Sequence, residues 1–422
     1  MAIMKVIADF HTHSRFAMAC SQNITLNGME SAAIEKGISL ISTGDFLHGS
    51  WLKEISANLE EGDGKGLFKL KGSNTGVKFI LSGEVCTIFN ASDKTLKKIH
   101  NCIALPSIDS VKALREVLLK RGILDSDGRP ILSMSAAELV EIVFGIDNDA
   151  LVFPAHAWTP YFGVLGSISG FNSIKDAYED QEKHIFALET GLSSDPPMNW
   201  CVSELDKYTL LSNSDMHSLP KMGREANVLE LEKNFDYRTV ISAIHDRDGK
   251  RFKGTIEFYP EEGKYHYDGH KNCQFSTAPG SGITACPVCG KKLVVGVLHR
   301  VLDLADRELG FRPNNAPSFT YIVPLREILA YALRKSVYSP IIDEEYSKLI
   351  GHFGTEFNVL IDAKIEEIAQ QSSEDVAQAV KNVRENKIHI EPGYAGIFGE
   401  LDLLGRKKTE KKGGQSMLKL AP

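Results

Sequence analysis

Two histidines separated by one residue follow a short apolar segment near the start of the chain. His11 and His13 come soon after Val6-Ile7-Ala8, in the stretch ADFHTHSRFA. In an extended segment alternate side chains lie on the same face, so the two imidazoles point the same way. Two neutral imidazoles on one face favour a shared metal ion, although His-x-His alone is a weak motif.

Acidic and histidine side chains follow other apolar runs in the same manner. ISTGDF ends near Asp45, ILSGEV contains Glu84, VFPAHAW contains His156, and LLSNSDMH ends on Asp215 and His217. In α/β barrels the loops after the carboxyl ends of the strands converge on one rim. We therefore predict one metal cluster whose ligands are His11, His13, Asp45, Glu84, His156, Asp215 and His217.

The ligand types indicate which ions such a cluster would hold. Mixed imidazole and carboxylate ligation suits zinc, manganese or iron better than calcium or magnesium. Seven ligands exceed the needs of one ion, so we expect two or three divalent ions, bridged by Glu84. Clusters of this kind hydrolyse phosphoesters, because a bound water becomes hydroxide near neutral pH and the ions neutralise charge in the transition state.

A second group of ligands lies further along the chain. HKNC and CPVCGKKL contribute a histidine and three cysteines with spacings of two, twelve and two residues: His270, Cys273, Cys286 and Cys289. Two such knuckles predict a closed, structural zinc site that staples a small module. His266 is a rival to His270, with a poorer spacing.

The elements that must position these residues alternate between apolar runs and amphipathic stretches. Eight runs up to about residue 255 are typical of buried strands: KVIADF, SLISTGDF, VKFILSGEV, NCIALP, DALVFPAHAW, HIFALETG, TLLSNSDMHS and NVLELE. Helical patterns lie between several of them, at 27–36, 110–121 and 135–144. This alternation predicts a mostly parallel α/β fold, either a barrel or a barrel-like sheet.

Helical patterns dominate after residue 298. They cover 298–309, 324–335 and 359–369, and in the last of these Ile361, Ile365 and Ile368 share one face. The domains expected from these patterns are a metal-binding α/β domain over 1–255, a zinc module over 256–298, a helical domain over 299–405 and a flexible basic tail over 406–422.

Composition sets limits on the function. The 422 residues are 43% hydrophobic and 24% charged, with a net charge of −7, which is ordinary for a soluble globular protein and gives no global attraction to nucleic acid. Three of the seven cysteines are clustered, and the other four are far apart without a regular spacing, which favours a reducing compartment. No apolar stretch is long enough for a bilayer and no secretory signal is apparent, so we expect a cytoplasmic protein without membrane contact.

The motifs resemble those of the PHP (polymerase and histidinol phosphatase) family. The resemblance rests on His11-Thr12-His13, Thr43-Gly44-Asp45, the region around His156, Ser214-Asp215-Met216-His217, and Glu84 in the place of the bridging glutamate. It implies a distorted seven-stranded β/α barrel around a trinuclear metal site. That family often has histidine directly after the motif-two aspartate, where this chain has Phe46; His48 is an alternative ligand or a solvated loop residue. Glu189 is better explained by a structural hydrogen bond than by ligation.

A PHP domain followed by a zinc module and a helical region resembles the endonuclease Q family over nearly the full length. The stretches HTHSRF, PAHAWTP, SNSDMHS, CPVCGKKL and GVLHRVLDLADRE carry this resemblance. It implies a metal-dependent endonuclease that nicks DNA on the 5′ side of deaminated bases (uracil, hypoxanthine, xanthine) and abasic sites. Asp215, Glu84, His11 and His13 would then be the catalytic residues.

Two alternatives remain open at this point. A small-molecule phosphoesterase of the histidinol-phosphatase type needs only the metal cluster, and leaves the zinc module and the helical region unexplained. A non-enzymatic nucleic-acid-binding module is disfavoured by the complete ligand set.

Two further segments suggest contacts with partners. HAWTPYF places Trp158, Tyr161 and Phe162 beside His156, where an aromatic face could hold a displaced base or could simply pack the rim. The segment from Gln415 to Leu420 resembles the short peptides that bind bacterial sliding clamps, although Ser416 replaces the commoner leucine. The alternative is an unstructured end whose basic residues attract DNA phosphates.

Overall fold

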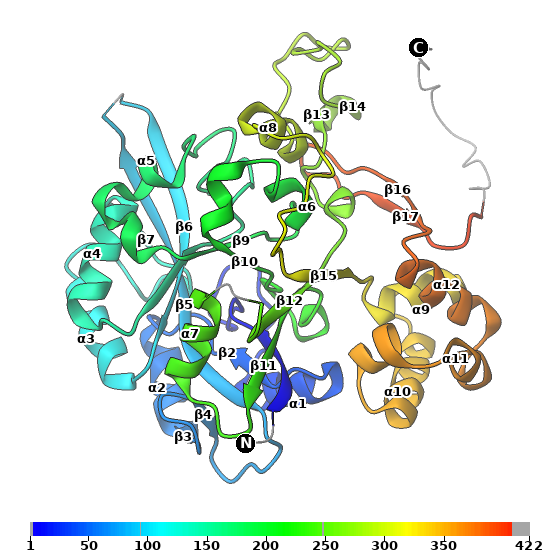
Figure 1. The fold of residues 1–422 in the computed structure, drawn as a ribbon, viewed down its shortest axis with the longest axis horizontal. Coiled ribbons are helices and arrows are strands. Elements are labelled where there is room, and N and C mark those ends of the chain that lie inside the picture. Colours follow the sequence, from blue (N-terminus) through cyan, green and yellow to red (C-terminus); the bar gives the residue numbers. More distant parts are fainter. Residues whose placement is uncertain (1–2, 93, 247–248, 407–422) are drawn as a thin grey trace.

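The central element of the fold is a mixed sheet, with helices on its flanks (Figure 1). The structure is a computed structural model that describes residues 3–92, 94–246 and 249–406. Within these residues the sheet has eleven strands, in the order β15-β12-β11-β1-β2-β5-β4-β3, with β6 and β7 also paired to β5, and β8 paired to β6. The strands are β1 (Ile3–Asp9), β2 (Leu40–Ser42), β3 (Leu59–Glu61), β4 (Phe68–Leu70), β5 (Lys78–Asn90), β6 (Leu96–Leu105), β7 (Ile131–Leu132), β8 (Leu151–Pro154), β11 (Ala226–Glu232), β12 (Phe252–Glu257) and β15 (Ser318–Tyr321).

All eight apolar runs marked in the sequence form strands. The remaining two are β9 (Ala187–Glu189) and β10 (Thr209–Leu211), which pair in parallel as a separate two-stranded sheet. The prediction of a mostly parallel sheet is wrong, because the pairs β1–β11, β5–β6, β6–β8 and β11–β12 are all antiparallel. The short turn between β5 and β6 forces this hairpin, which extends beyond the rest of the sheet in Figure 1.

The apolar runs of the central strands are buried on both faces, as in β2, β5 and β8. In β1 the side chain of Ile7 faces one hydrophobic cluster, while Val6 and Ala8 face another. The second cluster also receives side chains from β2, β5, β6, β8, β9, β10 and β11, and helix α7 (Tyr237–Asp246) covers it at one end. Side chains from a ring of strands therefore meet in one interior.

The helices around the sheet begin and end at the residues that capping rules favour. Thr25 accepts a hydrogen bond from Gly28 N at the start of α1 (Leu26–Lys36), which ends at Gly37 with φ of 90°. Ser107 and Ser135 cap α3 (Ile108–Leu118) and α4 (Ala136–Ile146) in the same way. These three helices confirm the predicted helical stretches. The others in this part are α2 (Gly49–Asn58), α5 (Ile174–Tyr178) and α6 (Pro196–Asn199), with short turns at Glu179–His184, Ser203–Lys207 and Leu219–Lys221.

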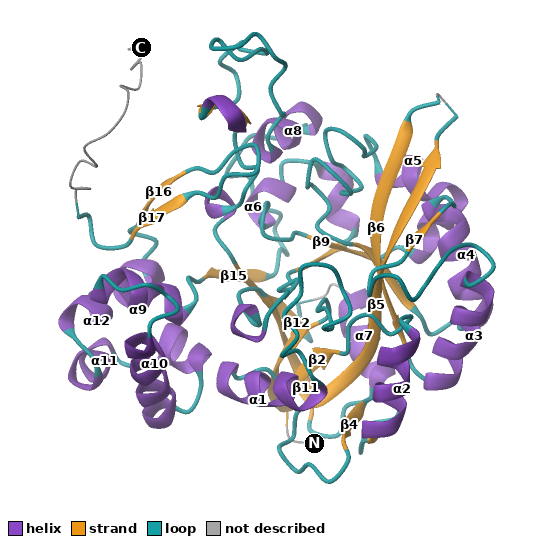
Figure 2. Cartoon of the chain, turned by 180° about the vertical axis from the view of Figure 1, so that it is seen from behind, coloured by secondary structure: helices purple, strands orange, loops and turns teal. Residues whose placement is uncertain are grey.

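The segment that carries the second ligand group leads into a helical part. It contains β13 (Asp268–His270), β14 (Phe275–Thr277), the short turns Pro260–Glu262 and Lys271–Cys273, and α8 (Val297–Leu304). Helices α9 (Leu325–Leu333), α10 (Pro340–Phe353), α11 (Ile365–Gln371) and α12 (Glu374–Arg384) then form a group beside the sheet, seen from behind in Figure 2. The hairpin of β16 (His389–Glu391) and β17 (Glu400–Asp402) returns the chain toward α8.

The prediction of a single helix over 359–369 is wrong. A π-helical turn covers Asn358–Asp362, the chain is extended at Ala363, and α11 starts at Ile365. The guanidinium of Arg384 explains the break, because it donates hydrogen bonds to the carbonyls of Val359, Leu360 and Ala363, at 2.7–2.8 Å. Those carbonyls are satisfied without a continuous helix.

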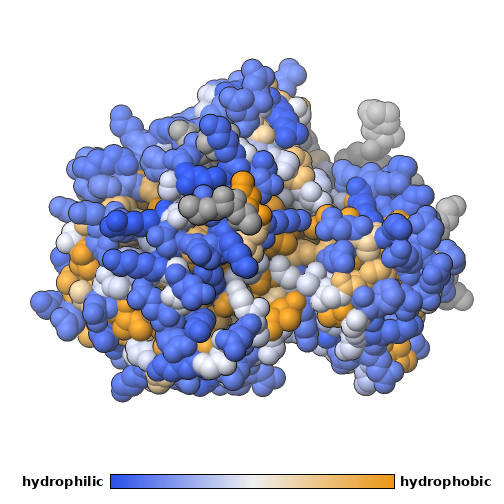
Figure 3. Space-filling model, turned by 60° about the horizontal axis from the view of Figure 1, so that its bottom comes forward, coloured by the Kyte–Doolittle hydropathy of each residue, from blue (hydrophilic) through white to orange (hydrophobic). Residues whose placement is uncertain are grey.

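The helical group is held to the sheet part by a buried ion pair. Lys36 Nζ lies 2.6 Å from Glu356 Oε2, and both side chains are less than 5% exposed. Glu356 also accepts hydrogen bonds from Tyr346 Oη and Leu325 N. The bottom face is largely hydrophilic, with apolar side chains in small patches, including near the boundary between the two parts (Figure 3). None of the helices in the described residues combines the length and apolar character of a membrane span.

Candidate metal centre

Glu84 is the meeting point of the predicted ligands. It lies within β5, its side chain is fully buried, and both carboxylate oxygens have close neighbours. Oε1 is 2.7 Å from His100 Nδ1 and 3.2 Å from His156 Nε2. Oε2 is 3.4 Å from His13 Nε2 and 3.7 Å from His11 Nε2. One carboxylate thus lies between two histidine pairs, which is the placement expected of a bridging ligand.

Asp215 and His217 add a third set of donors. Asp215 Oδ1 lies 3.0 Å from His13 Nε2, 3.7 Å from His11 Nε2 and 3.6 Å from His217 Nδ1. Within the described residues, three groups near Glu84 have donor atoms within 4.8 Å of one another: His11, His13 and Glu84; His13, Asp215 and His217; and Glu84, His100 and His156. Shared members make them one cluster, which we call the Glu84 cluster.

Three buried donor atoms in this cluster make no hydrogen bond of suitable geometry among the described residues, although the last two are only 3.0 Å apart: His11 Nε2, His13 Nε2 and Asp215 Oδ1. An unsatisfied buried polar atom costs about 1–3 kcal/mol, so three facing one centre require an explanation. Divalent ions bound by imidazole and carboxylate would satisfy them all. The residues present therefore fit the predicted ions.

Asp45 lies outside the three groups, on the far side of the His13 ring. Its Oδ1 is 2.9 Å from His13 Nδ1, and its Oδ2 accepts hydrogen bonds from Ser14 N and Oγ, at 2.6 and 2.7 Å. A carboxylate that receives the second ring nitrogen of a ligand histidine fixes the orientation and tautomer of that ring. The geometry thus favours a positioning role over the ligation that its sequence placement predicts.

Glu189 holds the other histidine of the first motif. Its carboxylate lies 3.0 Å from His11 Nδ1, and it accepts hydrogen bonds from His156 N and Asn213 Nδ2, at 2.6 and 2.8 Å. These contacts agree with a structural hydrogen-bonding role. His48 also lies outside the three groups: its ring stacks on Phe16, with centroids 4.4 Å apart.

The backbone at this centre is held in a conformation that most residues avoid. Asp45, His156 and Asp215 have φ values of 45°, 31° and 45°. Gly44 (φ 62°) comes so close to the first motif that a Cβ there would lie 2.4 Å from the Thr12 carbonyl oxygen. Left-handed backbone at three non-glycine residues is typical of a functional site whose surroundings impose it.

His100 is a member of the cluster that the sequence analysis missed. It lies inside β6, opposite Cys86 of β5, and only 4% of its surface is exposed. The predicted ligands all lie at or just after the ends of apolar runs, whereas His100 lies just before the run NCIALP. Only the pairing of β5 with β6 brings it to the centre: Glu84 pairs with Cys102, and His100 is two residues before Cys102.

The charges of the cluster favour an ionised carboxylate. Burial raises the pKa of Glu84, but attraction to His100 and His11 outweighs burial and holds this pKa well below its usual range. Arg129 adds a positive charge at the edge: its Nη1 is 3.3 Å from Glu84 Oε2, and its side chain is 26% exposed. Arg129 is another residue that the sequence motifs did not single out.

The three aromatic residues predicted near His156 have three different positions. Trp158 is fully buried and donates from Nε1 to Asn199 Oδ1, at 2.8 Å, so it packs the core and cannot receive a base. Phe162 stacks on the ring of His100, with centroids 4.4 Å apart. Tyr161 is 43% exposed and remains available to a ligand.

The second ligand group is assembled as expected. Donor atoms of His270, Cys273, Cys286 and Cys289 lie within 4.8 Å of one another. The turn after Cys286 is closed by Gly290 N donating to the Cys286 carbonyl, at 2.8 Å. His266 is buried, 5% exposed, and is not a member of this group. The three thiols therefore lie with the donor atoms of His270 and not with those of His266. We call these four residues the His270–Cys289 cluster.

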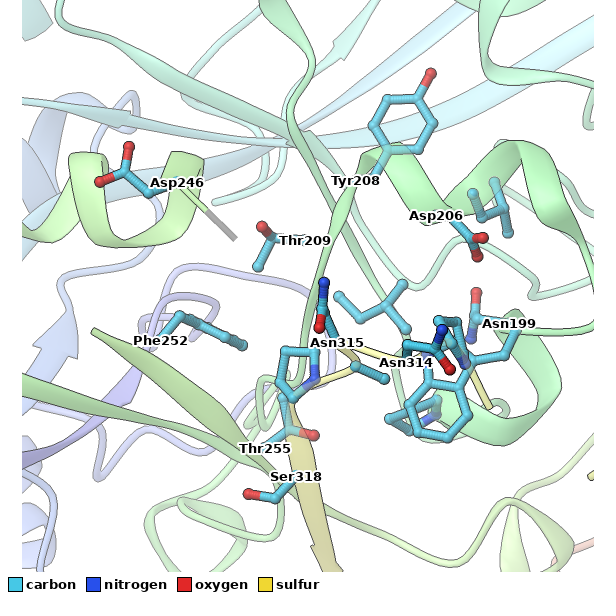
Figure 4. Close-up of a pocket in the computed structure, with 17 residues that line it drawn as sticks. Asn199, Asp206, Tyr208, Thr209, Asp246, Phe252, Thr255, Asn314, Asn315 and Ser318 are labelled. Carbon is cyan, nitrogen blue, oxygen red and sulfur yellow. The ribbon is translucent and has the colours of Figure 1, made fainter. Parts of the chain in front are cut away.

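A separate pocket of about 390 Å³ lies near the start of β10, and its lining includes Trp200, Phe252 and Asn314 (Figure 4). Thr209 and Leu210 of β10 contribute to the pocket, whereas Asp215 and His217 follow the opposite end of that strand. The pocket is therefore distinct from the Glu84 cluster.

A mixed α/β fold with a buried cluster of histidines and carboxylates is an arrangement that metal-dependent hydrolases use. Comparisons with known proteins narrow this class. The crystal structure of the lesion-specific endonuclease PfuEndoQ from Pyrococcus furiosus is 32% identical, covers 94% of this chain and 95% of that chain, and has a TM-score of 0.82. An endonuclease Q complex with a 27-mer duplex substrate, with an abasic lesion at the active site, is also 32% identical, covers 96% and 99% of the two chains, and has a TM-score of 0.84.

Two sequence comparisons cover different parts of the chain. The uncharacterized protein YqxK of Bacillus subtilis is 28% identical over 94% of this chain and 99% of its own length. The family model described as the MJ0043 C-terminal domain matches residues 324–387, which include α9–α12. The chain belongs to the endonuclease Q family.

Proposed function

We propose that this chain is a metal-dependent DNA repair endonuclease that nicks the phosphodiester 5′ of deaminated bases and abasic sites. Family membership supports a DNA hydrolase, and the related complex holds duplex DNA with an abasic lesion at its active site. The observation that carries the proposal is the Glu84 cluster, in which three sets of donors are linked by shared members, two of them through the buried Glu84 carboxylate and two through His13. Uracil, hypoxanthine and xanthine as substrates rest on the family resemblance.

We infer that the cluster holds two or three divalent ions (zinc, manganese, iron or magnesium). The proposed ligands are His11, His13, Glu84, His100, His156, Asp215 and His217. Such ions, when bound, supply a hydroxide nucleophile and neutralise charge on the phosphate. Glu84 would be a ligand shared between ions, while Glu189 orients His11 and Asp45 orients His13.

Arg129 is the proposed partner of the scissile phosphate. Its guanidinium reaches the cluster from the exposed side, while its backbone N donates to Asp127 Oδ1, at 3.0 Å, and fixes the loop. An arginine fork matches the geometry of phosphate oxygens and stabilises charge that develops on them. Arg129 would thus hold the phosphate group of the substrate against the metal-binding residues of the Glu84 cluster.

The finer features of the fold belong to the same proposal. Ala157 N donates to the Glu189 carbonyl, and Ser212 N to Asn227 Oδ1, so β9 and β10 bridge the gap between β8 and β11. This bridging supports a distorted β/α barrel. We also propose structural zinc at the His270–Cys289 cluster, the domain limits 1–255, 256–298 and 299–405, and a cytoplasmic location.

The proposed clamp-binding peptide, Gln415 to Leu420, lies outside the described residues, as does the tail from 407 onward. Deleting residues 415–422 should abolish association with a bacterial sliding clamp and leave nicking of free oligonucleotides intact. Retained clamp binding would rule out this peptide as the binding element.

An oligonucleotide panel tests the main proposal. The protein is incubated with Mn²⁺ or Zn²⁺ and with duplexes containing uracil, hypoxanthine, an abasic site or no lesion, alongside a phosphate monoester. Nicking confined to the lesion duplexes is the expected result. Hydrolysis of the monoester alone would instead identify a phosphatase of the histidinol-phosphatase type.

A further inference from the structure

Three segments that are far apart in the sequence bring aromatic and basic side chains together, and one of these segments begins at His156 of the Glu84 cluster. They are the loop after His156, the segment before the His270–Cys289 cluster, and the β16–β17 hairpin. Their side chains are Tyr161, Lys264, Tyr265, Lys271 and Phe398, which we call the aromatic–lysine surface.

The members of this surface are linked by direct contacts. The rings of Tyr161 and Tyr265 are 6.3 Å apart in an edge-to-face arrangement, and Lys264 Nζ lies 4.7 Å from the centre of the Phe398 ring. Gly396 lies between Tyr265 and Lys271: a methyl group on its Cα would be 3.9 Å from both Tyr265 Oη and Lys271 Nζ. Tyr265 and Lys271 therefore meet around Gly396 and Tyr161 contacts Tyr265, while the Lys264–Phe398 pair comes from the same two chain segments as Tyr265 and Gly396.

The surface is accessible. Tyr161 is 43% exposed, Phe398 is 55% exposed, Tyr265 is half-buried, and both lysines are exposed. Among the described residues, neither Lys264 nor Lys271 has an ion pair with an acidic side chain. Two exposed aromatic rings and two unpaired ammonium groups on a chain of net charge −7 indicate a local preference for an anionic, planar ligand.

The surface is also tied to the metal centre. Thr159 Oγ1 lies 2.9 Å from His156 Nδ1 and donates to the Tyr161 carbonyl, at 2.9 Å. Arg300 of α8 holds the far end of the same loop through the carbonyls of Leu165 and Phe171. A ligand on Tyr161 would accordingly lie next to the cluster, on a braced loop.

We propose that the aromatic–lysine surface binds the DNA strand next to the cleaved bond, with unstacked bases against Tyr161 and Tyr265 and phosphates at Lys264 and Lys271. Aromatic rings accept any base face, and interleaved lysines follow the backbone, which is how single-stranded nucleic acid is bound without sequence preference. The inference rests on the proposed nuclease function. It assigns the lesion-flanking nucleotides to a surface shared by three segments.

The first test uses a duplex with an abasic site flanked by 2-aminopurine, placed on the 5′ or the 3′ side. Binding is followed with the Asp215→Asn protein, so that no cleavage intervenes. Stacking on tyrosine should quench the probe on one side. In the Tyr161→Ala/Tyr265→Ala background this quenching should disappear and Kd should rise about tenfold.

Two control proteins separate stacking from a general loss of structure. Tyr161→Phe/Tyr265→Phe keeps both rings and should retain the quenching. Tyr338→Ala removes a tyrosine that is 89% exposed on the helical part and should leave quenching and Kd unchanged. Equal quenching in the double alanine variant and its parent would overturn the inference.

The lysines are tested by the salt dependence of binding. Lys264→Ala and Lys271→Ala should each reduce the slope of log K against log[salt] by about one, with no change in bound metal. Unchanged slopes in both variants would remove the phosphates from this surface. The proposed function fails separately, if wild-type protein with Mn²⁺ does not nick any lesion duplex.

Discussion

The Glu84 cluster and the His270–Cys289 cluster differ in burial, in ligand chemistry and in what holds their ligands. The first is made of imidazoles and carboxylates on strands and strand ends, and Glu84 and His13 are fully buried. The second is made of three thiols and one imidazole on short turns, and Cys289 is exposed. A thiol-rich set of four is a closed tetrahedral site, whereas a mixed, larger set leaves positions for water and substrate.

The two clusters also differ in the contacts that hold their side chains in place. Asp45 and Glu189 fix the rings of His13 and His11 from behind, and the sheet buries both of them. The turn from Cys286 to Gly290 rests on a few backbone hydrogen bonds. We therefore expect the Glu84 cluster to keep its shape without its ions, and the His270–Cys289 cluster to depend on its ion for folding.

The largest expected effect comes from Asp215→Asn. The substitution removes the charge of a donor shared with His11, His13 and His217, so nicking should fall about a thousandfold or more. Because the surrounding strands hold the centre, the unfolding temperature should change little. Asp109→Asn, at an exposed aspartate, is the matched control and should behave as wild type. Wild-type nicking by Asp215→Asn would remove Asp215 from the centre.

Cys286→Ser should show the opposite pattern. Three remaining ligands bind zinc weakly, so metal analysis of the full chain should show about one zinc less per molecule. Hydrogen exchange should speed up over residues 262–298 while β1, β5 and β11 stay protected. Cys201→Ser, at a cysteine outside both clusters, should keep its zinc. Equal protection of 262–298 in Cys286→Ser and wild type would contradict this dependence on the ion.

The sequence was sufficient for features that depend on local pattern. All eight marked apolar runs form strands, although β3, β4, β7, β12 and β15 were not marked. Short spacings bring together His11 with His13, Asp215 with His217, and the four residues of the His270–Cys289 cluster. These features could be recognised because a strand places alternate residues on one face, and a two-residue knuckle brings two thiols together.

Features that depend on tertiary contacts could not be predicted in this way. His100 joins the centre only because β6 pairs antiparallel with β5, and Asp45 lies behind His13 because Gly44 allows the two loops to approach. Trp158 is only two residues after His156, but its ring is buried in the core and its Nε1 donates to Asn199. The break before α11 depends on Arg384, more than twenty residues away.

Asp45→Ala tests the difference between a ligand and a residue that orients one. Loss of the acceptor for His13 Nδ1 should weaken metal binding about 10–100-fold. Nicking should then recover at high Mn²⁺. Asp45→Asn keeps an oxygen toward His13 and should lose less affinity than the alanine variant. Titration calorimetry with Mn²⁺ measures the metal affinity of both variants. If Asp45→Ala binds one ion fewer and its nicking does not recover at high Mn²⁺, Asp45 is a ligand.

The smallest effect is expected at His266, the histidine that the second cluster does not use. Burial lowers the pKa of His266 from its ordinary value of 6.5 to about 4. Because the folded-state pKa lies below that of the unfolded chain, protonation favours unfolding. The stability that neutral His266 provides is complete above pH 6.5 and is lost as the pH falls from 6.5 toward 4. Between pH 7 and pH 6 the loss should be about 0.7 kcal/mol.

Urea unfolding of the full chain at these two pH values, with excess Zn²⁺, measures this loss. His266→Gln does not titrate in this range, so its free energy of unfolding should fall by about 0.7 kcal/mol less than that of wild type. Comparing the change between two pH values cancels any constant cost of the substitution. Both proteins should contain the same amount of zinc, because His270 provides the imidazole ligand. Loss of zinc from His266→Gln would show that His266, and not His270, is the imidazole ligand. The same pH response in His266→Gln and wild type would show that His266 is not buried in its neutral form.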